Sequence, residues 1–143
     1  MISRTAEYAL RAIVYLADQE GKALTTQQIA EATRVPAGYL SKVLQALGRA
    51  GLVVSQRGLH GGFTLGSEPD QISVLTVINA VDPIQRIRRC PLGVQSHGEK
   101  LCPLHHRLDS AMEMVEQAFG ETTVAELLND PSQLRPLCDC RKE

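Results

Sequence analysis

The chain has 143 residues, 22% of them charged, and its formal net charge is −1 at pH 7. This length suffices for one domain with a hydrophobic core but is short for two independent cores, so we expect one domain with an appendage. No apolar run approaches the roughly 18 residues of a membrane-spanning helix, so the sequence predicts a soluble, cytoplasmic protein without a membrane partner. The net charge alone argues against a nucleic-acid-binding protein.

The charge is unevenly distributed, however. Residues 1–66 carry seven Lys or Arg and four Asp or Glu, a balance of +3, whereas residues 67–143 have a balance of −4. Between residues 32 and 67 there are four basic residues and no acidic residue. Exposed charges are screened beyond about 8–10 Å, so a local basic patch binds phosphates even on an acidic chain. The alternative interpretation is a solvated charged face.

Helical periodicity dominates the N-terminal half. Apolar residues at helical spacing predict an amphipathic helix over residues 3–18. Thr25 followed by Gln28 is a capping-box pattern, which begins a short helix. A second short helix is expected to begin at residue 36 or 37, with Gly51 as its C-terminal cap. Two short helices joined by a tight turn form a helix-turn-helix.

A two-stranded wing is expected next. Short apolar segments at residues 52–54 and 63–65 flank a glycine-rich turn that carries Arg57 and His60 near its tip. After the wing, Ser73 is expected to cap a further helix that ends at residue 82.

A long helix is expected to begin at Pro103. Its apolar residues alternate by four and three positions, which is typical of a self-associating seam: Leu104, Leu108, Ala111, Val115 and Ala118. Packing against its own domain is the alternative, but helix-turn-helix proteins usually act as two-fold dimers, which favours a homodimer. Thr123 with Glu126 predicts one more short helix.

The sequence therefore predicts a mainly α fold, a winged helix-turn-helix with a long C-terminal dimerisation helix. We divide the chain into a winged helix-turn-helix DNA-binding domain over residues 1–82 and a cysteine and histidine sensing loop over residues 83–102. The dimerisation helix and the short C-terminal helix occupy residues 103–129, and residues 130–143 form a tail.

Thiol and imidazole side chains are concentrated before and at the start of the long helix: Cys90, His97, Cys102, His105 and His106. Because cytosolic thiols are kept reduced, we interpret the cysteines as ligands or redox thiols rather than as a disulfide framework. Cys138 and Cys140 in the tail are interpreted as bystanders, since fixing a tail as a ligand costs conformational entropy.

Several motifs together resemble the Rrf2 family of bacterial winged-helix regulators. They are Ala6–Ala12, Tyr39-Leu40, Gly51-Leu52-Val53, Arg57-Gly58 with Gly61-Gly62-Phe63, and Val77–Asp82. The resemblance extends to about residue 128 and implies a homodimer with two DNA-reading heads and a long crossing helix.

The DNA-binding candidates lie on the polar face of the second reader helix and in the wing: Gly38, Tyr39, Ser41, Lys42, Gln45, Arg49, Arg57 and His60. Ser41 and Gln45 suit base edges, whereas Lys42 suits guanine or phosphate. The resemblance implies that Arg57 is the wing arginine that enters the minor groove of double-stranded operator DNA. A tyrosine in the position of Tyr39 more often packs against the core or the turn than contacts a base.

The resemblance also implies a metal cofactor. Cluster-binding members of the family have three cysteines before the long helix, and one such member has a histidine three residues after the last cysteine. Cys90 and Cys102 match the outer two cysteines and His105 matches the histidine, but Ser96 stands in the position of the middle cysteine. His97 is a weaker candidate, because mixed Cys/His ligation of a two-iron cluster is chemically sound.

Glu7 aligns with a first-helix carboxylate that, in related sensors, completes the cluster from the other subunit. The resemblance thus implies a 2Fe-2S iron-sulfur cluster held by Cys90, Cys102, His105 and Glu7 of the partner subunit. The alternative role for Glu7 is a surface ion pair with Arg11 or Arg4, worth under about 1 kcal/mol.

We therefore expect a DNA-binding transcription regulator that senses redox, nitric-oxide or iron-sulfur status through a cluster. A cluster-free regulator of the same fold, with Cys90 and Cys102 as a thiol switch or with bound zinc, is the alternative. A protein-protein adaptor is a third. An enzyme is not expected, because no nucleophile–base pairing or phosphate loop is evident.

Overall fold

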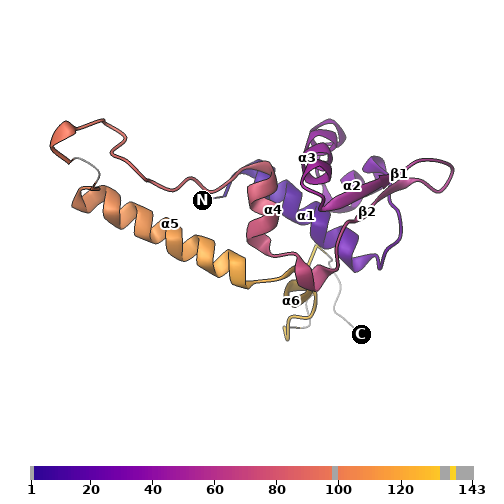
Figure 1. The fold of residues 1–143 in the computed structure, drawn as a ribbon. Helices are drawn as coiled ribbons and strands as arrows, with labels where there is room; N and C mark the ends of the chain where they lie inside the picture. Colours follow the sequence, from indigo (N-terminus) through magenta and orange to yellow (C-terminus); the bar gives the residue numbers. More distant parts are fainter. Residues whose placement is uncertain (1, 98–99, 133–135, 138–143) are drawn as a thin grey trace.

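Three helices and a small sheet form the N-terminal part of the protein in the computed structural model, which describes residues 2–97, 100–132 and 136–137 (Figure 1). These elements are α1 (Arg4–Asp18), α2 (Thr26–Thr33), α3 (Ala37–Arg49), β1 (Val53–Gln56) and β2 (Gly62–Leu65). The remaining elements are η1 (Pro69–Gln71), α4 (Val74–Val81), η2 (Gln95–His97), α5 (Pro103–Glu121) and α6 (Val124–Leu128). The expected mainly α fold with a helix-turn-helix and a two-stranded wing is confirmed.

Local hydrogen bonds explain where the helices begin. The Ser3 hydroxyl accepts a hydrogen bond from the Ala6 N–H and caps α1. Thr25 and Gln28 form the expected capping box at α2, because the Thr25 hydroxyl accepts from the Gln28 N–H and the Gln28 side chain accepts from the Thr25 N–H. These bonds satisfy backbone donors that have no partner inside the helix.

The C-terminus of α3 explains the glycine at position 51. The Leu52 N–H donates to the Leu47 carbonyl at 3.0 Å, and the Gly51 N–H donates to the Gly48 carbonyl at 3.0 Å. Gly51 has φ of +76°, a left-handed conformation that glycine adopts without steric cost. This Schellman motif turns the chain directly into β1.

The wing is antiparallel, with Val53 opposite Leu65 and Gln56 opposite Gly62. Leu24, before α2, adds a short bridge to Phe63, with N–H to carbonyl distances of 3.0 and 2.7 Å. Gly62 has φ of +147°, and a Cβ atom there would lie 2.5 Å from the Leu24 backbone. The close approach therefore requires glycine and ties the wing to the start of the helix-turn-helix.

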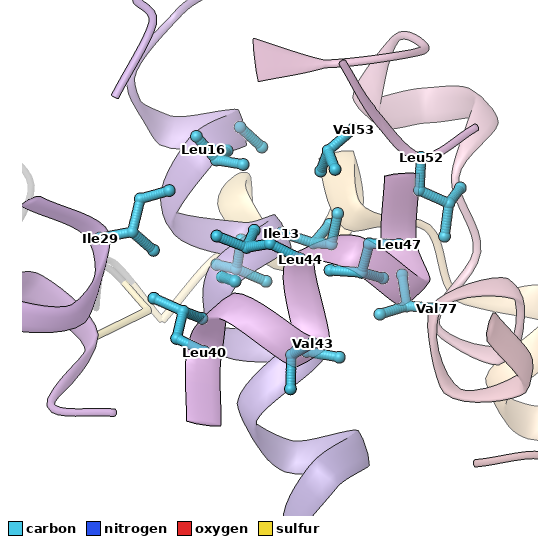
Figure 2. Close-up of a cluster of buried hydrophobic side chains, with 14 of the residues drawn as sticks. Ile13, Leu16, Ile29, Leu40, Val43, Leu44, Leu47, Leu52, Val53 and Val77 are labelled. Carbon is cyan, nitrogen blue, oxygen red and sulfur yellow. The ribbon is translucent and has the colours of Figure 1, made fainter. Parts of the chain in front are cut away.

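The core lies between α1, α2, α3 and the wing (Figure 2). Its fully buried side chains include Ile13 of α1, Ile29 of α2 and Leu44 of α3. Val77 of α4 and Val124 of α6 also belong to this core. Thus α6, which sequence analysis grouped with the dimerisation helix, packs against the winged helix.

By contrast, α5 projects away from these elements (Figure 1). The chain after α4 runs out to the far end of α5, and α5 leads back to the core. None of the residues of α5 is buried within one chain. No helix of the described ranges has the length and apolarity required to cross a membrane.

Candidate DNA interface and sensing loop

The two faces of α3 differ in burial as sequence analysis expected. Leu40, Val43, Leu44 and Leu47 are buried in the core. The opposite face exposes every helical candidate for DNA binding, namely Gly38, Tyr39, Ser41, Lys42, Gln45 and Arg49. The exposed face carries two cations and no acidic residue, so it is chemically suited to nucleic acid.

The turn between β1 and β2 presents the remaining candidates. Arg57 and His60 are both exposed there. The Gly61 N–H donates to the Gly58 carbonyl at 3.0 Å, which closes the turn. Leu59 at the tip is 95% exposed, so this end of the wing has no packing role within one chain.

Tyr39 lies on the first turn of α3 and contacts α1. Its ring meets the Tyr8 ring edge to face, with centroids 5.3 Å apart and an interplanar angle of 84°. The Tyr39 and Thr5 hydroxyls are hydrogen-bonded. These contacts fit the packing role that the sequence suggested for Tyr39, whereas a contact between Tyr39 and DNA stays a prediction.

Glu7 forms an ion pair with Arg11, with Oε1 and Nε 3.1 Å apart. The Arg11 Nη1 donates to the Thr33 carbonyl at 3.3 Å, and the guanidinium carbon lies 5.5 Å from the centre of the Tyr8 ring. The ion pair is therefore the arrangement within a single chain, and ligation by Glu7 of the partner subunit stays a prediction.

Cys102 and His105 come together at the start of α5. Cys102 is the N-cap residue, and its Sγ lies 3.3 Å from the His105 Nδ1. Both residues are half-buried, as is Cys90, whose carbonyl accepts a hydrogen bond from the Gly93 N–H. Cys90 and Cys102, the cysteines within the described ranges, are thiols rather than disulfide sulfurs.

The expected ligands do not form a complete metal site in one chain. Among the described residues, no group of three or more His, Cys, Asp or Glu side chains is placed to hold a metal ion. Ser96 and His97 lie in the short helix η2. Cys138 and Cys140 lie outside the described residues.

An ion cluster that sequence analysis missed fixes the start of the sensing loop to α5. The Arg86 guanidinium contacts both carboxylate oxygens of Asp109, at 2.7 and 2.8 Å, and also Glu116 at 3.1 Å. The Ile87 N–H donates to the same Asp109 carboxylate at 2.9 Å. The hydrogen bond from Arg86 holds the pKa of Asp109 well below its usual range, and the same bond raises the pKa of Arg86.

The acidic half of this ion cluster can be recognised in the sequence. Asp109, Glu113 and Glu116 follow one another at spacings of four and three, which places three carboxylates on one face of α5. The spacing does not identify Arg86, which lies 23 residues before Asp109.

Known proteins match nearly the whole chain. A family model described as "Rrf2: Iron-dependent Transcriptional regulator" matches residues 2–130. The HTH-type transcriptional regulator NsrR of Geobacillus kaustophilus is 29% identical over 148 residues, covering 99% of this chain and 98% of the relative.

Solved structures also match most of the chain. CymR, the global cysteine regulator of B. subtilis, is 27% identical with a TM-score of 0.75, covering 90% of this chain and 96% of CymR. IscR of T. potens is 25% identical with a TM-score of 0.76, covering 94% of this chain and 91% of IscR.

Proposed function

Because the chain belongs to the Rrf2 family, and is therefore a DNA-binding transcription regulator and not an enzyme, we propose that it binds a pseudo-palindromic operator as a homodimer and responds to a metal group in its sensing loop. The observation that carries this proposal is the division of one chain into a packed head, which exposes a cationic reader face, and a projecting helix with two metal-ligand side chains at its start.

The projecting helix supports the homodimer. Leu108 on α5 is 45% exposed, and Leu104 is more exposed still. Beside the helix lies an apolar groove of about 440 Å³, lined by Ile78, Ile84 and Val115 among others. A second α5 that covers this stripe would remove apolar surface from water and set two reader helices about one DNA turn apart or somewhat more.

DNA reading is tested by two substitutions. Arg57→Ala should weaken binding to the specific operator by about tenfold or more, through loss of a guanidinium in the minor groove. Lys42→Ala should reduce the salt dependence of binding by about one unit of slope if its contact is to phosphate. Fluorescence anisotropy over a salt series measures both, and unchanged affinity and slope in both variants would contradict the assignment.

The donor set at the loop suits an iron-sulfur cluster in part. Cys102 and His105 already approach each other, Cys90 lies on the same loop, and thiolate and imidazole both bind iron in two-iron clusters. Glu7 of the partner subunit would be the fourth ligand. A bound 2Fe-2S cluster would supply a centre that is sensitive to reduction and nitrosylation.

A bound cluster would change the ion pair between Glu7 and Arg11. The carboxylate of Glu7 is half-exposed and can pair with only one group at a time, and within a single chain it pairs with Arg11. Ligation in the partner's loop would take that carboxylate away from Arg11 and connect the two heads. Oxygen is a hard ligand that leaves iron readily, which suits a reversible connection.

A cluster-free sensor is the second candidate, and Ser96 is the observation that favours it. Serine stands where cluster-binding relatives carry the middle cysteine, so one chain offers only two thiols in the loop. Cys90 and Cys102 would then act as a thiol switch, or would bind zinc with histidine ligands.

Metal analysis separates the two candidates. Protein purified without oxygen should contain iron and sulfide in equal amounts, and Cys90→Ser and Cys102→Ser should each abolish visible absorption. Cys138→Ser is the matched control and should keep it. Colourless protein without iron and sulfide would refute the cluster, and stoichiometric zinc in that protein would support the second candidate.

A further inference from the structure

We propose that Arg11 and Tyr8 of α1 are positioning residues that hold the first turn of the DNA-reading helix, and that Glu7 controls their position. The proposal starts from the Arg11 guanidinium, which contacts three groups at once. Its Nε pairs with Glu7, its Nη1 donates to the Thr33 carbonyl, and its plane lies near the Tyr8 ring.

The contact with Thr33 fixes the turn of the helix-turn-helix. Thr33 is the last residue of α2, and its carbonyl belongs to the helix end, where backbone acceptors lack partners inside the helix. The next residue, Arg34, has φ of +57°, so the chain changes direction directly after this carbonyl. A hydrogen bond from Arg11 at this point restrains the angle at which α3 leaves α2.

The contact with Tyr8 leads to α3 itself. The Tyr8 ring meets Arg11 and also the ring of Tyr39. Tyr39 is further anchored by its hydroxyl on Thr5. Tyr39 occupies the first turn of α3, the part of a recognition helix that meets bases. Its contacts with α1 therefore orient this end of α3.

Glu7 is the accessible end of this set of contacts. Its side chain is 47% exposed, whereas Thr33 is buried. The control by Glu7 rests on the proposed function, since it requires a competing ligand for the carboxylate. Because one guanidinium bonds Glu7 through Nε and the Thr33 carbonyl through Nη1, loss of Glu7 changes the balance of the other two contacts of Arg11.

The first test compares Arg11→Lys with the control Arg4→Lys in the full-length protein, with iron content measured for each variant. The probes are a duplex selected from a random pool by the wild-type protein and a random-sequence duplex. Arg11→Lys keeps the charge but loses the fork, so we expect about 2- to 30-fold weaker binding to the selected duplex. Binding to random DNA and the melting temperature should not change, and Arg4→Lys should match the wild type.

Equal weakening on both duplexes would show a general electrostatic effect and overturn the positioning role. The result is independent of the metal, because the Arg11 contacts exist within one chain. Protein without iron would therefore end the cluster proposal and leave the Arg11 test intact.

The second test is a double-mutant cycle between Thr5→Val and Tyr39→Phe. If the Tyr39 hydroxyl acts by docking on Thr5, each variant weakens selected binding equally and the double variant adds nothing. If only Tyr39→Phe weakens binding, the hydroxyl contacts DNA directly and the positioning role of this contact is wrong.

Glu7→Ala tests the control step, and it is compared with the wild type in protein freed of metal, so that loss of the proposed cluster ligand does not contribute. We expect it to weaken binding to the selected duplex in the same direction as Arg11→Lys, by a smaller factor. Wild-type affinity in Glu7→Ala beside weakened binding in Arg11→Lys would mean that Arg11 positions α3 without Glu7, and would overturn the control step alone.

Discussion

The two ends of this molecule are stabilised in different ways. The head, residues 2–82 with 122–128, contains side chains such as Leu44 and Val124 that are fully buried. The arm, residues 83–121, has no buried residue among those that the structure describes, and the Arg86 ion cluster attaches its first segment to α5. The head has a buried core of its own, whereas the arm is attached by the Arg86 ion cluster and by Ile84 and Phe119, which pack against Ala6, Val74 and Ile78 of the head.

This difference matters for a regulator. A well-packed core favours one geometry of the reader residues, and we expect a sparsely packed arm to rearrange at low energetic cost. The contacts of Arg11 and Tyr8 lie on the head side, where a change at Glu7 reaches α3 without disturbing the core.

The largest effect is expected where the arm needs a partner. Leu108→Glu combined with Val115→Glu places two charges on the apolar stripe of α5 and should convert the proposed dimer to monomers, as measured by light scattering. Gln117→Glu, on a different face of α5, is the control and should stay dimeric. A stable dimer in the double variant would show that the stripe is not the interface.

A cavity in the core of the head should cost more stability than a truncation at the exposed surface of the head. Leu44→Ala should lower the free energy of unfolding by about 2–5 kcal/mol, measured in urea, because Leu44 is fully buried. Leu59→Ala at the exposed wing tip should change it by less than about 0.5 kcal/mol. Similar losses in both variants would contradict the packing described for the core.

The smallest effect concerns the attachment of the arm. Asp109→Asn should speed amide exchange at Ile87 about tenfold, because the neutral side chain weakens both contacts of the carboxylate. Glu113→Gln is the control, since Glu113 lies 3.8 Å from Arg86 and is mostly exposed. Unchanged exchange in Asp109→Asn would show that the cluster does not hold the loop.

The same cluster has a defined pH response. The pKa of Asp109 is lowered, so its contribution to stability is present above the ordinary carboxyl pKa and is lost only as the pH falls through the lowered value. Protection at Ile87, corrected for intrinsic exchange, should therefore stay constant between about pH 5 and about pH 8.

Local chemistry explains what the sequence could predict. Helix starts at Thr25, Ser73 and Thr123 follow from side chains that bond to the backbone three residues later, so the boundaries were accessible. The proximity of Cys102 and His105 likewise follows from helical spacing at the start of α5.

Long-range packing explains what the sequence could not predict. The ion pair of Arg86 with Asp109 and the contact of Tyr39 with Thr5 depend on the path of the whole chain. The docking of α6 was also missed, because five residues carry no periodicity that distinguishes one apolar surface from another. The alternative role of Glu7, pairing with Arg11 four residues later, was accessible from spacing alone.

The start of α4 and the end of α5 lie side by side. The Val74 N–H donates to the Thr122 carbonyl and the Val124 N–H donates to the Ile72 carbonyl, both at 2.9 Å. The segment that runs from α4 through the loop to α5 is therefore closed at its base by backbone hydrogen bonds, and each doubling of a flexible loop within it costs only about 0.6 kcal/mol of closure entropy. The length and ligand content of the sensing loop can thus vary through evolution with little penalty to the DNA-reading fold.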